Sequence, residues 1–97
     1  MSGRDDPRIR RRELILKLLK YLLERPDAKD TLEGVICWWL PQNGRGFDAT
    51  EVLDALDSLI SKGLVTASTI VGSTVIYGTQ RDRLRDIELF LERNGAK

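Results

Sequence analysis

Residues 48–63, DATEVLDALDSLISKG, decide the fold prediction for this chain. Asp48, followed three residues later by Glu51, has the pattern of a capping box, in which each side chain satisfies a free backbone amide at the start of a helix. An apolar stripe of roughly 120° follows at helical spacing: Ala49, Val52, Leu53, Leu56, Leu59 and Ile60. Lys62 and Gly63 suit the end of a helix. The segment therefore predicts one amphipathic helix with defined ends.

An uncharged stretch, residues 64–79, follows this helix directly. It is rich in β-branched residues and predicts two strands, at 64–69 and 74–77, with Val71 near the turn between them. Thr79 then predicts the cap of a final helix, with Asp82 at the reciprocal position. The order is a helix, a hairpin and another helix.

A long helix is predicted upstream, from about residue 8 to residue 25. Pro7 suits its first turn, and Arg25 precedes Pro26, which ends it. Its apolar residues span an arc of roughly 200°, whereas packing against a single core needs a stripe of only about 100°. We expect this helix to lie at the centre of the core with neighbours on two sides. The alternative is a subunit interface.

A second helix is predicted after Asp30, which forms a capping-box pattern with Glu33. Its buried face is expected to comprise Leu32, Val35, Ile36 and Trp39. Gly34 suggests a close helix crossing. Trp38 points about 100° away from the neighbouring tryptophan on a helix. We expect it to cover the following loop; the alternative is an exposed contact residue.

The order of elements gives a mainly α fold class with a small β-hairpin. The run of Leu56, Leu59, Gly63, Leu64 and Val65 resembles the end of the third helix in the winged helix-turn-helix superfamily. This resemblance covers about residues 8–79, and extends to residue 93 if the final helix is included. It implies three helices, a two-stranded wing and a C-terminal helix, with the third helix as the usual DNA-reading element.

The composition is that of one soluble globular domain. The chain has 97 residues, of which 41% are hydrophobic and 32% charged. We expect a flexible N-terminus at 1–7, the domain at 8–93 and a tail at 94–97. The sequence shows neither an apolar run long enough for a membrane span nor a signal peptide. A single cysteine, Cys37, is expected to be buried at the core or its edge, and it favours a reducing cytoplasm.

Charge is unevenly distributed along the chain. Residues 1–25 contain eight basic and four acidic residues, whereas residues 26–63 contain three basic and seven acidic residues. Attraction to an anionic partner should therefore come from arginines outside the third helix. The candidate phosphate contacts are Arg8, Arg10, Arg11 and Arg12 near the N-terminus, and Arg81, Arg83 and Arg85 near the final helix.

The third helix presents carboxylates where a DNA-reading helix would carry Arg, Lys, Asn or Gln. The hairpin turn has no basic residue to contact phosphate. We therefore predict a docking face for a protein partner, made of Glu51, Asp54, Asp57, Trp38, Ile70 and Val71. The simpler alternative is a solvated helix face, where carboxylates near the N-terminus interact favourably with the helix dipole. The third alternative is base reading, in which a carboxylate accepts a hydrogen bond from cytosine.

No residue pattern predicts catalysis. The chain has no histidine, and its one cysteine forms neither a zinc site nor a redox pair. We expect no catalytic residue, metal, cofactor or small-molecule substrate. The leading hypothesis is a non-catalytic winged-helix module that acts through protein–protein interaction or self-association, such as a homodimer. The alternative is a DNA-binding transcriptional regulator that contacts phosphates through its Arg-rich N-terminal segment.

Overall fold

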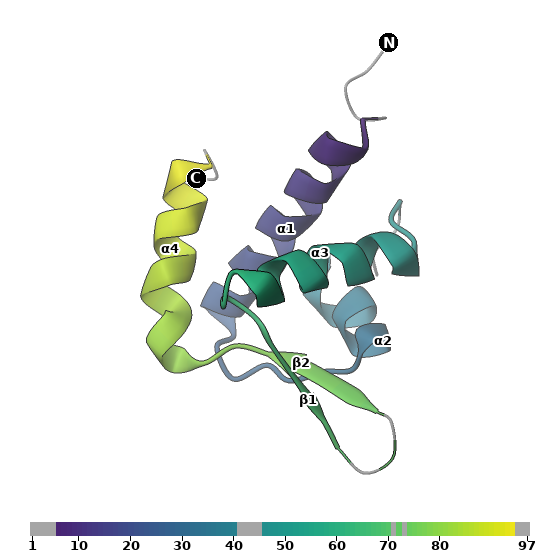
Figure 1. The fold of residues 1–97 in the computed structure, drawn as a ribbon. Helices are drawn as coiled ribbons and strands as arrows, with labels where there is room; N and C mark the ends of the chain where they lie inside the picture. Colours follow the sequence, from purple (N-terminus) through teal and green to yellow (C-terminus); the bar gives the residue numbers. More distant parts are fainter. Residues whose placement is uncertain (1–5, 41–45, 71, 73, 95–97) are drawn as a thin grey trace.

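The computed structural model describes residues 6–40, 46–70, 72 and 74–94 (Figure 1). Its elements are, in chain order, α1 (Pro7–Glu24), α2 (Leu32–Gly34), the π-helical turn η2 (Val35–Trp39), α3 (Ala49–Ser61), β1 (Thr66–Thr69), β2 (Val75–Gly78), the 3-10 turn η4 (Arg81–Arg83) and α4 (Leu84–Arg93). The predicted fold class and order of elements are confirmed. The predicted chain ends are 1–7 and 94–97, of which residues 1–5 and 95–97 lie outside the described residues, as does Val71 in the hairpin turn.

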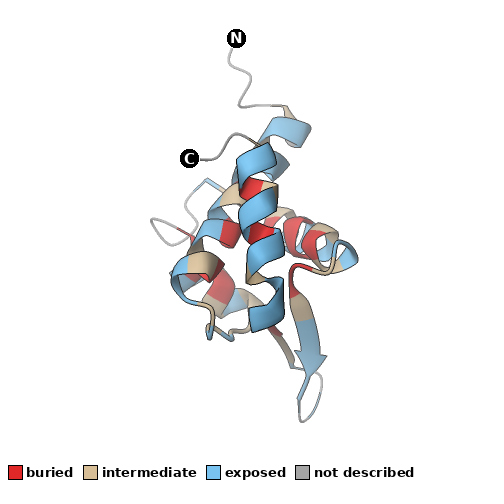
Figure 2. Ribbon diagram, turned by 90° about the vertical axis from the view of Figure 1, so that its left-hand side faces the viewer, coloured by how far each residue is buried: buried red, intermediate tan, exposed pale blue. Residues whose placement is uncertain are grey.

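Helix α1 lies at the centre of the protein. Asp6 caps it and Pro7 occupies its first turn. Its fully or almost fully buried residues are Leu14, Ile15, Leu18, Leu19 and Leu22. Helix α3 and η2 pack against one side of α1 and α4 against another (Figure 1). Figure 2, viewed from the α4 side, shows that most of α4 is exposed. The prediction of central packing is therefore confirmed, and the wide apolar arc is used inside the protein.

The start of α2 corrects one predicted cap. The capping residue is Thr31, whose side chain accepts a hydrogen bond from the backbone amide of Gly34. Asp30 instead accepts a 2.8 Å hydrogen bond from the indole nitrogen of Trp39. Gly34 does mark a close approach, but to its own chain, because a Cβ atom there would lie 2.8 Å from the Cβ atom of Asp30.

Helix α3 begins and ends as predicted. Asp48 and Glu51 form the complete capping box. Gly63 follows the helix with a φ angle of 77°, which favours glycine. The core side of the helix carries Val52, Ala55, Leu56 and Leu59, all fully buried. Leu53, predicted on the apolar stripe, is 38% exposed.

The hairpin is tied to the segment that precedes α2. Strands β1 and β2 are antiparallel, with Ser68 opposite Ile76. The outer side of β2 pairs with Asp30, whose backbone exchanges two hydrogen bonds of 3.0 and 2.8 Å with Tyr77. This contact joins chain segments on either side of α3.

The predicted Thr79 cap is wrong. Thr79 is buried, and its hydroxyl donates a 2.8 Å hydrogen bond to the carbonyl of Leu64. The chain then makes the 3-10 turn, and α4 starts at Leu84 without a side-chain cap. Thr79 therefore ties the exit of the hairpin to its entry.

Candidate protein-binding surfaces

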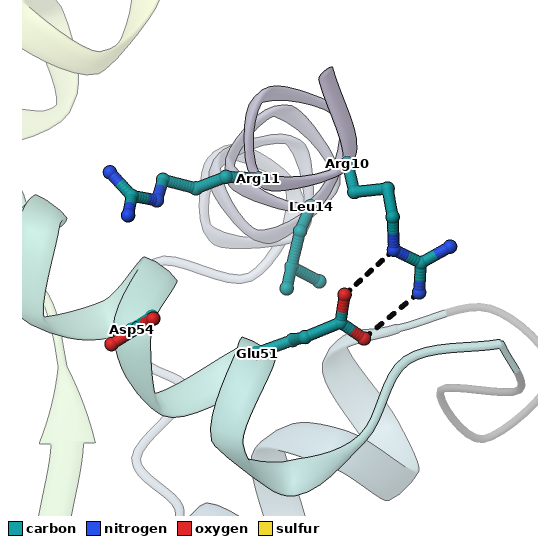
Figure 3. Close-up of a pocket in the computed structure, with 5 residues that line it drawn as sticks. All are labelled: Arg10, Arg11, Leu14, Glu51 and Asp54. Carbon is teal, nitrogen blue, oxygen red and sulfur yellow. Dashed lines mark hydrogen bonds and ion pairs between the residues drawn. The ribbon is translucent and has the colours of Figure 1, made fainter. Parts of the chain in front are cut away.

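The residues of the predicted docking face do not share one surface. Asp54 lines a small pocket between α1 and α3 together with Arg11 (Figure 3). Trp38 lines a groove together with Lys17 and Lys20 of α1. The pocket takes residues 10–14 of α1, whereas the groove takes residues 17–24. The pocket and the groove therefore lie at different levels along α1.

The first surface is the aromatic groove, whose lining includes Lys17, Lys20, Tyr21, Glu24, Trp38 and Trp39. Trp38 is 69% exposed, the largest exposed fraction among the large apolar side chains of the described residues. The two lysines are also exposed. An apolar ring is thus presented to solvent beside two positive charges and the carboxylate of Glu24.

The groove has a well-packed floor. The ring of Trp39, 2% exposed, stacks on that of Tyr21 with centroids 5.6 Å apart and an interplanar angle of 14°. Its indole N–H is satisfied by Asp30. The prediction that Trp38 covers the following loop is wrong, because Trp39 is the ring directed into the core while Trp38 stays in solvent.

The second surface is the acidic face, defined as Leu53, Asp54 and Asp57 on the exposed side of α3. All three residues are exposed. The pKa of Tyr77 on β2 is raised, first by burial of its hydroxyl and second by the negative charge of Asp57. The acidic face is a regular helix surface with two adjacent carboxylates.

Glu51 does not belong to this acidic face. Its carboxylate accepts hydrogen bonds of 2.7 and 2.9 Å from the guanidinium of Arg10 (Figure 3). The bond from Arg10, followed by that from the Asp48 amide, lowers the pKa of Glu51. Arg10 also bonds to the carbonyl of Gly46 and lies over the ring of Phe47. This cluster joins α1 to α3, so we assign Glu51 and Arg10 a structural role rather than a role in partner binding.

The last predicted docking residues lie at the hairpin. Ile70 is 52% exposed, as the prediction requires. Its amide donates a 2.9 Å hydrogen bond to the carbonyl of Thr74, which closes the hairpin. Val71 lies outside the described residues. Ile70 is therefore available for contact, away from the aromatic groove.

The predicted phosphate contacts near the N-terminus are partly engaged within the protein. Arg12 donates a 2.8 Å hydrogen bond to the carbonyl of Asn94, at the end of α4. Arg8 lies 3.7 Å from the carboxylate of Asp6. Both residues, and Arg11, are exposed. Such exposed contacts are weak, so a phosphate group could compete for these arginines.

The arginines near α4 form a separate group. Arg81 pairs with Asp27 at 2.8 Å and Arg83 with Asp86 at 3.3 Å, while Arg85 is exposed. Helices α1 and α4 run antiparallel, so this group and the N-terminal group lie at opposite ends of the pair (Figure 1). The structure does not gather the seven predicted phosphate contacts on one patch.

Lys17 and Lys20 were not among the site residues predicted from the sequence. Both lie on the exposed side of α1. Their proximity to Trp38 depends on how η2 packs against α1, through the contact between Trp39 and Tyr21. The sequence shows only that Lys17 and Lys20 are three residues apart and that Trp38 lies on the following helix. It does not show which way the Trp38 ring points.

The described residues offer no metal centre. Among residues 6–40, 46–70, 72 and 74–94, no three His, Cys, Asp or Glu residues are placed to hold a metal ion. Cys37 is exposed, so the prediction that it is buried is wrong. None of the described helices has the length and apolar character needed to cross a membrane.

No protein-family model, curated protein or solved structure matches this chain. Its function is therefore inferred from its own surfaces. The two best defined are the aromatic groove and the acidic face.

Proposed function

We propose that this protein is a non-catalytic winged-helix module that binds another protein through its aromatic groove. The winged-helix assignment is supported by the order of elements and by the capped α3, which leads directly into the hairpin. The binding role is supported chiefly by one observation, the 69% exposure of Trp38 beside a packed aromatic floor.

An exposed tryptophan in a groove is a favourable anchor for a protein contact. A tryptophan ring offers a large apolar surface, and truncation of interface tryptophans often removes much of the binding free energy. Lys17 and Lys20 add apolar stems along the groove and charged groups at its rim. Because Tyr21 and Trp39 are already packed, little of the floor has to be ordered on binding.

The experiment is affinity capture from a lysate of the cells that make this protein. Wild type, Trp38→Ala and the control Leu89→Ala serve as baits. Leu89 is also an exposed apolar residue, but it lies on α4. We expect proteins retained by wild type and by Leu89→Ala to be lost with Trp38→Ala. Retention of the same proteins by all three baits would contradict the proposal.

DNA binding by the N-terminal segment is the second candidate function. It is supported by the exposure of Arg8, Arg11 and Arg12 on the first turns of α1. On this hypothesis, a duplex titration at ~50 mM salt shows binding that weakens steeply as salt is added, with a log–log slope of about −0.9 per phosphate contacted. Loss of that binding in an Arg11→Ala, Arg12→Ala variant would support it. Absence of binding at low salt would exclude it.

A further inference from the structure

We propose that the aromatic groove is occupied by the acidic face of a second copy of this chain. This inference rests on the proposed function and adds the identity of the partner. The contact would place Asp54 and Asp57 of one copy against Lys17 and Lys20 of the next. Leu53 would lie against Trp38.

The groove carries Lys17 and Lys20 against one carboxylate, Glu24, and the two lysines match the acidic face in charge and spacing. Lys17 and Lys20 are three residues apart on α1, and Asp54 and Asp57 are three residues apart on α3. Side chains at this spacing are neighbours on a helix, with Cβ atoms about 5–6 Å apart. Each pair also has an exposed apolar residue within the same surface, Trp38 in the groove and Leu53 on the acidic face.

These charges are available for an intermolecular contact. All four side chains are exposed. Within the described part of the chain, no ion pair involves any of the four. The carboxylate of Glu51, in contrast, is already occupied by Arg10. Complementary charges of this kind favour encounter and fix the register of a complex.

The geometry makes the contact intermolecular and directional. The pocket lined by Asp54 takes residues 10–14 of α1 and the groove takes residues 17–24, and within the described residues no ion pair joins the two lysines to the two aspartates of the same molecule. Each copy would present a groove to one neighbour and an acidic face to another. Such a head-to-tail contact produces a ring if it closes and an open chain if it does not.

The contact should be weak and reversible. Only a few side chains from each copy take part. We therefore expect the buried surface to be smaller than the roughly 1,200–2,000 Å² of a stable specific complex. The expected behaviour is therefore association that grows with protein concentration. Added salt should weaken it, since the paired charges lie near the surface.

Sedimentation of charge-reversed variants tests the proposal. Wild type at ~50 mM salt should form concentration-dependent oligomers. Lys17→Glu with Lys20→Glu, and separately Asp54→Lys with Asp57→Lys, should each weaken association about tenfold or more, because each variant then presents like charges. Mixing the two variants should restore oligomers, since each altered surface meets the opposite charge on the other variant. A monomeric wild type, or a mixture that stays monomeric, overturns the proposal.

Two controls separate this contact from general attraction. Glu88→Lys with Glu92→Lys makes the same change in net charge as Asp54→Lys with Asp57→Lys, but on the exposed side of α4, and should leave self-association intact. Adding Trp38→Ala to both members of the rescuing mixture keeps their charges and should abolish rescue. Rescue that persists without Trp38 overturns the proposal. If the chain stays monomeric while Trp38 is still needed to capture another protein, this inference fails and the proposed function stands.

Discussion

The aromatic groove and the acidic face are built in different ways. The acidic face lies on a single regular helix, so its residues follow from the spacing of α3 alone. The groove is assembled from α1 and η2, and its shape depends on the stack between Tyr21 and Trp39. A substitution in the floor of the groove should therefore damage the fold, whereas a substitution on the acidic face should not.

The largest effect is expected for Trp39→Ala. This change removes a buried ring and its stack on Tyr21, and leaves the carboxylate of Asp30 without its donor. The free energy of unfolding should fall by about 3–5 kcal/mol. Trp38→Ala should change it by only about 0.5 kcal/mol or less, as for an ordinary exposed position. Urea unfolding of both variants measures the difference; equal losses would mean that Trp38 is also part of the core.

A smaller effect is expected for Glu51→Gln, which replaces the carboxylate that Arg10 holds between α1 and α3. The pair is partly exposed, so we expect a loss of about 0.5–1 kcal/mol in the free energy of unfolding at neutral pH. Asp54→Asn on the acidic face is the matched control and should change stability less. A larger loss for Asp54→Asn would show that the acidic face is structural.

The effect of Glu51→Gln should also depend on pH. Folding lowers the pKa of Glu51, chiefly through the Arg10 hydrogen bond, so the folded state favours the ionised form. Its contribution to stability is present at neutral pH and is lost as pH falls through the folded pKa. Wild type and Glu51→Gln should therefore converge in stability in acid. Urea midpoints between neutral pH and pH ~3 measure this convergence, and a constant gap would contradict it.

The smallest effect is expected for Asp57→Asn, read through Tyr77. Burial and then the charge of Asp57 raise the pKa of Tyr77, so removing the charge should lower that pKa towards its ordinary value. Asp54→Asn is the control and should leave it unchanged. Tyrosinate absorbance in an alkaline titration follows the change. An unchanged pKa of Tyr77 in Asp57→Asn would show that the charge of Asp57 does not influence Tyr77.

The sequence correctly predicted the helices and helix ends that are determined by residues close together in the chain. The capping box at Asp48, the glycine at 63 and the central position of α1 follow from spacing within one helix. The predicted helix starts at Asp30 and Thr79 were wrong because both side chains bond to partners outside the first helical turn. The Asp30 carboxylate accepts from the Trp39 indole, and the Thr79 hydroxyl donates to the Leu64 carbonyl.

The candidate site was predicted less completely than the fold. Asp54, Asp57 and Ile70 are exposed as predicted, because periodicity separates the outer and core sides of an element. Glu51 was misplaced, since its pairing with Arg10 bridges 41 positions of sequence. Lys17 and Lys20 were missed because a groove between two elements has no periodicity of its own.

The backbone bridge between Asp30 and Tyr77 would be broken if the chain were cut between α2 and α3. Together with the pair formed by Arg10 and Glu51, it joins the part before residue 41 to the part after residue 45. Neither part contains both members of either contact. Expressed as separate fragments, the two parts should complement each other and fold only in combination, so this protein could be used as a split reporter.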